Sequence, residues 1–289
     1  MGIINCTPDS FFDGNRHCNA VQAFEHGLKL LDDGANILDI GGESTRPGFT
    51  PVSEEEELAR VLPVVEMLAK EQSRKNFQIS IDTAKANVAL RAVKAGASII
   101  NDISAMEHDP EMLRTIIDTR ANAVLQHNLK YAGGTSSVGD VKNYLIKRAA
   151  LLEGKTESIF IDPGIGFGKT QDENLALIAN INELCQTKFL VLLGVSRKSY
   201  IGKIKGLENS NRLVPSIVSG IIAVQKGVKI LRVHDVLETR EALIIATALS
   251  GESSPVAFFT GANSSSRTTP AKNIVPSFGK ASNKSCSNL

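Results

Sequence analysis

The chain lacks several features that would assign it to a class at once. Its four cysteines, Cys6, Cys18, Cys185 and Cys286, are scattered without a Cys-x-x-Cys pair, which argues against a zinc site or a disulfide framework. No apolar run is long enough to cross a bilayer, and no signal peptide opens the chain. The formal net charge is only +1, so there is no general attraction to nucleic acid or to an anionic membrane. These absences favour a cytoplasmic protein with small-molecule partners and neither nucleic-acid nor membrane partners.

What the sequence does contain is a repeated unit. Residues 32–40, 94–102 and 225–233 each read as a helix end, a glycine and a short apolar run that closes on or beside a polar residue. Gly34, Gly96 and Gly227 fit the position after a helix where a positive φ is needed. The apolar runs do not alternate with polar residues, which is typical of parallel strands buried on both faces.

Extending this unit along the chain predicts eight strands, at 2–6, 36–40, 78–82, 97–101, 122–126, 158–162, 189–194 and 229–233. Helices are predicted near 19–33, 84–95, 109–119, 140–153, 171–184, 209–226 and 236–249, with another after Ser53. Ser53 with Glu56, and Thr170 with Glu173, have the spacing of a capping box. Strictly alternating strands and helices predict an α/β fold with a parallel sheet, and eight units in about 250 residues favour a closed (β/α)8, or TIM, barrel.

The barrel is expected to occupy residues 1–250. Residues 251–289 are rich in Ser, Asn, Thr and Gly and show no helical or strand period, so they are predicted to form a disordered tail. The first predicted strand adjoins Met1, which leaves no segment to cover the amino-terminal mouth of the barrel.

Polar residues close every predicted strand: Asn5, Asp39, Asp82, Asn101 with Asp102, His127 with Asn128, Asp162, Ser196, and Arg232 with His234. Barrel enzymes keep their chemistry at the carboxyl ends of the strands. Any one of these residues could instead cap a helix or bond a loop amide. A whole ring of them predicts an active site, because enclosed carboxylates need a ligand to offset their desolvation.

Three loops after the strands carry further signals. Residues 41–48 (GGESTRPG) hold adjacent glycines, two hydroxyls and a rigid Arg-Pro step. Residues 194–202 (GVSRKSYIG) place Arg197, Lys198 and Ser199 at the expected start of a short helix, which favours an anion. Residues 162–169 (DPGIGFGK) lack the spacing of a P-loop, and their glycines either let the backbone approach a flat ligand or form an ordinary turn.

The residue types indicate the kinds of ligand. Asp82, Asp162 and Asn101 suit a heterocycle rich in N–H donors. A phosphate-bearing group could be bound, directly or through Mg²⁺, by Asn5, Thr45, Arg232 and His234. Lys198 and Ser199 suit a second anion such as a carboxylate. The residues alone therefore predict two ligands, one planar and one anionic.

These motifs together resemble the dihydropteroate synthase family of pterin-binding barrels. The matching strings, in the order of the family, are GIINCTPDSFFDG (2–14), DIGGESTRPG (39–48), SIDT (80–83), IINDIS (99–104), FIDPGIGFGK (160–169), LLGVSRKSYIG (192–202) and LRVHDV (231–236). The resemblance implies a (β/α)8 barrel, usually a homodimer, that joins 6-hydroxymethyl-7,8-dihydropterin pyrophosphate to p-aminobenzoate in folate biosynthesis. It also implies dependence on Mg²⁺ and competition by sulfonamides at the p-aminobenzoate site.

The resemblance assigns roles to particular residues. It implies pterin binding by Asp82, Asn101, Asp162 and Lys198, and pyrophosphate binding by Asn5, Thr45, Arg232 and His234, with Asn5 nearest the metal. It implies p-aminobenzoate binding by Phe11, Thr45, Pro47, Phe167 and Ser199, with Ser44 and Arg46 in the same mobile loops. The implied catalytic set is Asp82, Asp162, Lys198, Arg232 and His234. The implied mechanism is dissociative, with pyrophosphate leaving before the aniline nitrogen attacks.

The chain departs from the family pattern at four places. It lacks the usual amino-terminal hairpin, as expected of a fragment or of the back part of a fusion with hydroxymethyldihydropterin pyrophosphokinase. The segment between His127 and Asp162 is short, Gln126 stands where many members have Met, and Pro215 falls inside a predicted helix.

Two other hypotheses stay open at this point. One is a pterin-barrel methyltransferase that binds methyltetrahydrofolate, although such barrels have no need of the STRPG and SRKS segments. The other is a barrel that binds pterin without catalysing a reaction.

Overall fold

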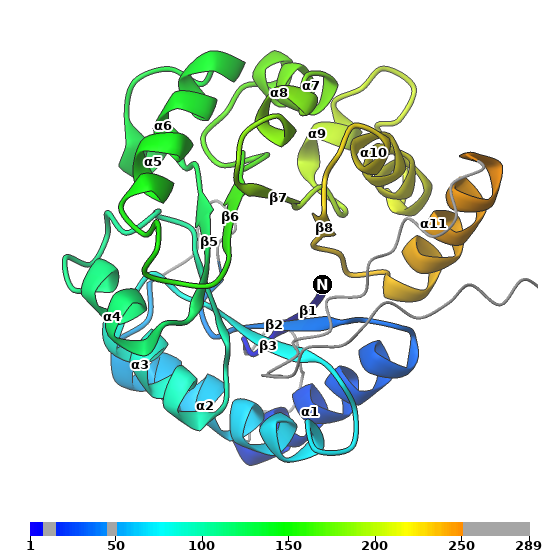
Figure 1. The fold of residues 1–289 in the computed structure, drawn as a ribbon. Helices are drawn as coiled ribbons and strands as arrows, with labels where there is room; N and C mark the ends of the chain where they lie inside the picture. Colours follow the sequence, from blue (N-terminus) through cyan, green and yellow to red (C-terminus); the bar gives the residue numbers. More distant parts are fainter. Residues whose placement is uncertain (8–15, 45–50, 251–289) are drawn as a thin grey trace, which may run out of the picture. The chain divides into compact units, whose positions relative to one another are not determined.

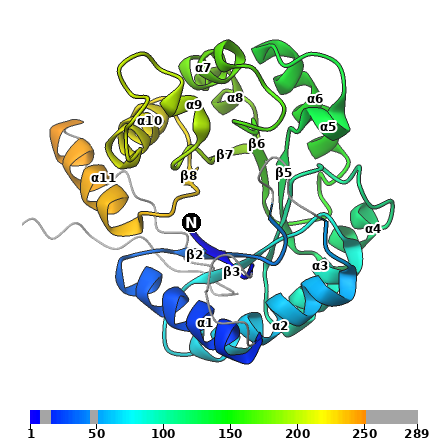
Figure 2. The same cartoon turned by 180° about the vertical axis from the view of Figure 1, so that it is seen from behind.

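Eight parallel strands alternate with helices along residues 1–7, 16–44 and 51–250, which are the residues that the computed structural model describes. The strands are β1 (Gly2–Asn5), β2 (Ile37–Gly41), β3 (Gln78–Asp82), β4 (Ile99–Asp102), β5 (Asn122–Gln126), β6 (Ile159–Asp162), β7 (Leu190–Leu193) and β8 (Ile230–Leu231). Each strand pairs with the next one in sequence, from β1 to β8. The strands form an inner ring, and the helices lie outside it (Figures 1 and 2).

The ring closes between its first and last strands. A parallel bridge joins Gly2 to Val233, just beyond β8. The N–H of Ile3 donates to the carbonyl of Val233 at 3.1 Å, and the N–H of Val233 donates to the carbonyl of Met1 at 2.9 Å. The predicted (β/α)8 barrel is therefore confirmed.

The helices are α1 (Arg16–Asp32), α2 (Glu54–Glu71), α3 (Ala86–Ala95), α4 (Met112–Thr119), α5 (Leu129–Ala132), α6 (Val138–Ala150), α7 (Gln171–Ala179), α8 (Asn182–Cys185), α9 (Ser199–Gly202), α10 (Leu213–Gln225) and α11 (Val236–Ser250). Thr170 and Glu173 make the predicted capping box of α7, and the Ser53 hydroxyl accepts the N–H of Glu56 at the start of α2. Gly96, after α3, has a φ of 126°, and a Cβ there would lie 2.5 Å from that of Ala69.

Most predicted helices shift by up to three residues at an end, and two differ more from those observed. The single helix predicted over 171–184 is wrong, because the backbone leaves the helical region at Asn180 (φ −112°, ψ 25°) and resumes as α8. The helix predicted over 209–226 begins only at Leu213. Pro215 therefore lies in the first turn of α10, where its missing N–H costs no helical hydrogen bond.

The core has an inner and an outer part. Inside the barrel a small cluster packs from six strands: Ile37, Ile99, Val124, Phe160, Leu192 and Ile230. Because side chains alternate between the two faces of a strand, the residue two positions further along also points inward. This rule places Asp39, Asn101, Gln126, Asp162, Gly194 and Arg232 in the next layer, toward the carboxyl ends of the strands. The apolar inner core thus lies directly beneath a layer of mostly polar residues at the carboxyl-terminal mouth of the barrel.

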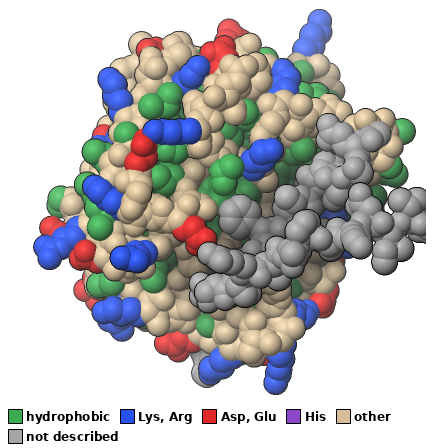
Figure 3. Space-filling view, viewed as in Figure 1, with side chains coloured by type: hydrophobic (Ala, Val, Ile, Leu, Met, Phe, Trp, Pro, Cys, Tyr) green, Lys and Arg blue, Asp and Glu red, His purple; other side chains and the backbone are tan. Residues whose placement is uncertain are grey.

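Charged side chains of both signs are interspersed over the face of the molecule in Figure 3. Within the described residues, no helix is both long and apolar enough to cross a membrane. The predicted tail at 251–289 lies outside the described residues, so the boundary at 250 stays a prediction.

Candidate active site

One arginine and two carboxylates lie together at the mouth of the barrel. Arg232 donates from Nε to Asp39 Oδ2 and from a terminal nitrogen to Asp82 Oδ2, each at 2.6 Å. Asp39, which is fully buried, also accepts from the hydroxyl of Ser80 at 2.6 Å and from the amide of Asn101 at 3.1 Å. Strands β2, β3 and β4 and the residue that follows β8 therefore contribute to one hydrogen-bonded cluster.

Burial governs the charge state of these carboxyl groups. Desolvation raises the pKa of Asp82, and the guanidinium of Arg232 offsets that rise only in part. Burial likewise raises the pKa of Asp162, against the opposing charge of Lys198. Three carboxylates, Asp39, Asp82 and Asp162, thus face the two cations Arg232 and Lys198, an arrangement that favours added positive charge.

Lys198 lies beside Asp162 on the loop that follows β7. Its ammonium donates to the carbonyl of Ile165 and lies 4.8 Å from the centre of the Phe167 ring. Burial lowers the pKa of Lys198 from 10.5 to about 8, although the charge of Asp162 raises it. Gly194 lies beside both groups, since a Cβ there would be 3.7 Å from the ammonium and 4.0 Å from Asp162 Oδ2, which is ordinary contact distance.

The loop after β6 is held by two side chains, Asp162 and Lys169, that form hydrogen bonds with backbone groups. Asp162 Oδ1 accepts the N–H of Gly164 at 2.7 Å. Gly164 has a φ of +68°, and a Cβ there would lie 1.9 Å from the carbonyl oxygen of His127, so only glycine fits. Lys169 donates to the carbonyls of His127 at 3.0 Å and Gly164 at 2.9 Å, and burial lowers its pKa to about 7. This bracing role of Lys169 was not predicted, although its place at the end of the glycine-rich loop was a signal.

Three of the residues predicted to hold pyrophosphate, Asn5, Arg232 and His234, lie at the end of β1 or just after β8, where the barrel closes. His234 is exposed, and its Nδ1 lies 3.0 Å from the hydroxyl of Ser196. Asn5 ends β1 and pairs in register with Gly41. The Nε of Arg197 donates to Asp235 at 2.9 Å, so this guanidinium is already engaged by a carboxylate. If the anion site predicted at residues 197–199 exists, its donors would be Lys198 and the exposed Ser199 rather than Arg197, and the site stays a prediction.

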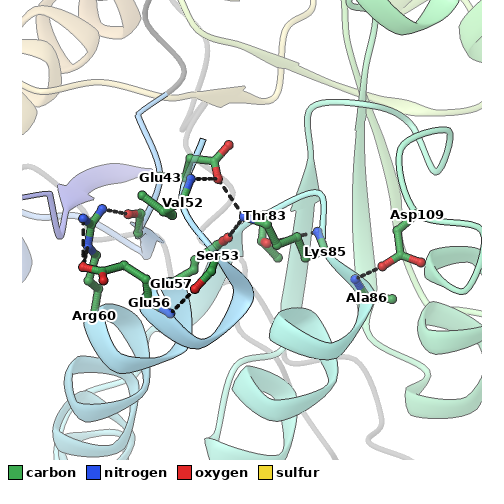
Figure 4. Close-up of polar contacts among 11 residues, drawn as sticks. Glu43, Val52, Ser53, Glu56, Glu57, Arg60, Thr83, Lys85, Ala86 and Asp109 are labelled. Carbon is green, nitrogen blue, oxygen red and sulfur yellow. Dashed lines mark hydrogen bonds and ion pairs between the residues drawn. The ribbon is translucent and has the colours of Figure 1, made fainter. Parts of the chain in front are cut away.

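The loop after β2 is anchored at both ends by a second cluster (Figure 4). Glu43 accepts the N–H of Val52 at 3.2 Å and the ammonium of Lys85 at 2.6 Å. Lys85 also pairs with Glu57, which is 1% exposed. On the other side, Arg60 donates to the carbonyl of Gly42 at 2.7 Å. These contacts form the stem of the loop, and Ser44 is the last described residue before its gap.

Four residues of the predicted substrate-binding loops lie outside the described residues: Phe11, Thr45, Arg46 and Pro47. The half-buried Phe167 is described, and it lies next to Lys198. The roles predicted for all of these residues stay predictions.

Three strand-end residues instead have structural contacts. Asp102 accepts the N–H groups of Ser104 at 2.8 Å and Met106 at 2.6 Å, which closes a turn. Asn128 caps α5. His127 points away from the barrel interior and packs edge-on against Tyr144, with ring centres 5.1 Å apart. Sequence reasoning gave no specific role to Asp39, which has four hydrogen-bonding contacts to three neighbours.

Comparison with known proteins gives concordant matches. The family model described as pterin binding enzyme matches residues 1–234. The dihydropteroate synthase of Bacillus subtilis is 44% identical over 239 residues, which cover 82% of this chain and 83% of the relative. The structure of Xanthomonas albilineans dihydropteroate synthase with 4-aminobenzoic acid is 42% identical, with a TM-score of 0.80 and coverage of 87% of this chain and 93% of that one. The same enzyme in complex with 7,8-dihydropteroate is 39% identical, with a TM-score of 0.76 and the same coverage.

Proposed function

Because this chain belongs to the dihydropteroate synthase family of pterin-binding enzymes, we propose that it joins 6-hydroxymethyl-7,8-dihydropterin pyrophosphate to p-aminobenzoate. The products are 7,8-dihydropteroate and pyrophosphate. The observation that carries the proposal is the set of Asp39, Asp82 and Asp162 facing Arg232 and Lys198 at the barrel mouth. This set offers carboxylates to a ring rich in N–H donors and cations to a departing anion.

The charge balance supports a dissociative reaction. The bond between the pterin methylene carbon and the pyrophosphate oxygen breaks first, and its electron pair leaves with pyrophosphate. The positive charge that spreads over the pterin is favoured by Asp82 and Asp162. Arg232 and His234 stand near the negative leaving group. The aniline nitrogen of p-aminobenzoate then forms the new carbon–nitrogen bond and loses a proton.

The second substrate fits beside Phe167. Its ring would lie between Phe167 and the loops that carry Phe11, Thr45 and Pro47, and its carboxylate would meet the exposed Ser199. Closure of these loops would exclude water, which competes with the aniline for the cation. Cys6 has no place in this scheme, because burial raises the pKa of its thiol to about 12 and keeps it protonated.

The residues at this mouth fit Mg²⁺ if the ion is held by one protein oxygen together with the substrate's phosphates and water. In residues 1–7, 16–44 and 51–250 no group of three or more His, Cys, Asp or Glu side chains could hold a metal ion by itself. Mg²⁺ in phosphate-transferring sites often takes one or two protein oxygens together with substrate phosphates and water. The half-buried Asn5 at the end of β1 would supply the protein oxygen, and the bound ion would neutralise charge on pyrophosphate.

A second copy of the chain is the proposed partner. Helices α10 and α11 pack against each other and expose Val214, Val218, Ile222, Ile245 and Leu249, and all of these except Val214 line one hollow between the two helices. Apolar side chains gathered on adjoining elements are typical of an interface rather than of a solvated surface. One such face on each copy suits a two-fold homodimer. The cytoplasmic location and the fused or associated pyrophosphokinase stay predictions.

Turnover tests the proposal. The full chain is mixed with the pterin pyrophosphate, p-aminobenzoate and Mg²⁺, and both pyrophosphate and dihydropteroate are measured. Equal amounts of the two products are expected, and sulfonamide should suppress them in competition with p-aminobenzoate. A folded sample that binds pterin without forming product would support the non-catalytic hypothesis. Binding of methyltetrahydrofolate without p-aminobenzoate competition would favour a methyltransferase.

A further inference from the structure

Gln126, the last residue of β5, points into the barrel. Val124 belongs to the inner cluster of the barrel, whereas Leu125 belongs to the outer core between strands and helices. Side chains alternate along a strand, so Gln126 lies on the face of Val124 and one layer higher. That layer is the one that contains Asp162 and Arg232. An amide therefore lies on the wall of the proposed pterin site.

The side-chain nitrogen of Gln126 is unpaired. The residue is 5% exposed, and its Nε2 atom has no hydrogen-bond partner among the described residues. A buried N–H without an acceptor costs free energy, which native proteins avoid unless a ligand or an ordered water supplies the acceptor. Here the unpaired donor lies on the inner wall of a barrel whose mouth is built from ligand-binding side chains.

The neighbour of Gln126 provides the complementary group. Gln126 pairs in register with Asp162, the carboxylate proposed to accept N–H groups of the pterin. The next loop passes close by, because a Cβ at Gly164 would lie 3.2 Å from Cγ of Gln126. Adjacent strands thus present a donor beside an acceptor. The amide edge of a pterin ring has the matching pattern, with a ring N–H next to a ring carbonyl.

We propose that Gln126 is a specificity residue of the pterin site, whose Nε2–H donates to the ring carbonyl while Asp162 accepts the adjacent N–H. This inference rests on the proposed function and extends it to the choice of heterocycle. The pair selects 4-oxo rings over 4-amino rings, because a 4-amino group would set a donor against the donor of Gln126.

Isothermal titration of the full chain with two unreactive probes tests the inference. The probes are 6-hydroxymethylpterin, which has the ring carbonyl, and its 2,4-diamino counterpart, which has an amino group there. Gln126→Met preserves the length of the side chain and removes the donor. We expect it to weaken the binding of 6-hydroxymethylpterin about tenfold and to leave the binding of the diamino probe unchanged or tighter, because the opposing donor is gone. The ligand-free variant should melt at the same temperature as the parent or higher, because an unpaired buried amide is gone.

Gln22→Met is the matched control, because Gln22 on the outer helix α1 also has a buried, unpartnered amide atom, Oε1, among the described residues. It should leave both affinities unchanged. If Gln126→Met does not fold, Gln126→Leu makes the same test with a smaller side chain. Unchanged binding of 6-hydroxymethylpterin, or equal weakening of both probes, would overturn the inference and leave the proposed function intact. A parent chain that binds neither probe would overturn both.

Discussion

Lys198 shows how one residue links burial to the proposed chemistry. Its ammonium lies between Asp162, the Phe167 ring and the backbone carbonyl of Ile165. Burial lowers its pKa from 10.5 to about 8, so the side chain is mostly charged at pH 7 and loses that charge as the pH rises through about 8. The positive charge balances part of the negative charge of Asp162, and in the proposed pterin site a charge-assisted hydrogen bond from Lys198 would exist only while the side chain is protonated.

Replacement of Lys198 should change both the size of kcat/KM and its dependence on pH. At pH 7, Lys198→Ala should lower kcat/KM for the pterin substrate roughly ten- to hundredfold, since a charge-assisted hydrogen bond contributes about 1.5–3 kcal/mol. The parent should lose activity as pH rises through about 8, because the charged form is the lower-pH form, whereas the variant should lack this limb. Lys188→Ala, at an exposed lysine paired with Glu153, is the control. Identical profiles for the parent and Lys198→Ala would contradict the role.

At the scale of elements, the loop after β2 depends on a polar stem between α2 and α3. Lys85, just before α3, meets Glu43 from the loop and Glu57 from α2. Glu57 is almost fully buried, and its Oε1 atom has no partner among the described residues. Since Glu43 also accepts the N–H of Val52, the same carboxylate ties residue 43 to residue 52. The stem therefore fixes where the loop containing Thr45 and Pro47 begins and ends.

Removal of the central cation should destabilise the stem. Lys85→Met leaves two carboxylates together, one of them buried, and should cost about 3 kcal/mol of unfolding free energy, measured by urea denaturation. Adding Glu57→Gln to Lys85→Met removes the uncompensated charge and should restore a large part of that loss. The matched control is Lys75→Met, whose exposed ion pair with Asp32 should contribute little. A double variant as unstable as Lys85→Met would show that the stem is held by packing instead.

At the scale of the whole molecule, the barrel mouth is polar, whereas helices α10 and α11 expose an apolar face. Val214 is 65% exposed, Ile245 is 61% exposed and Leu249 is 83% exposed. Ile245 and Leu249 line a hollow between the two helices, which lie outside the ring of strands (Figure 1). An apolar face of this kind is costly in water unless another surface covers it.

A charge placed on this face should separate the two copies. Ile245→Asp should convert the proposed dimer to a monomer at micromolar concentration, as measured by light scattering coupled to gel filtration, because the charge would be buried at the interface. Leu151→Asp, at a 38% exposed leucine that follows α6, should leave the dimer intact. A monomeric parent chain, or an unchanged Ile245→Asp dimer, would mean that the copies do not associate through this face.

Much of this protein follows from the sequence itself. Short apolar runs after glycines such as Gly34, Gly96 and Gly227 predict parallel strands and their number, because buried strands need continuous apolar residues and helix ends need a positive φ. The polar residue at each strand end predicts the location of the site, because parallel strands bring their carboxyl ends to one mouth. The motifs predict the family, which the comparisons confirm.

Only the tertiary structure decided which strand-end residues meet. Neighbouring residues such as Gln126 and His127 point to opposite faces, and a one-residue difference in register would exchange them. Asp39 and Asp82 come from different strands and share Arg232 only because the barrel closes, across 193 and 150 positions of sequence. Such pairings are absent from any local pattern, because hydrogen bonds, burial and shifted pKa values arise from distances that the packed barrel alone defines.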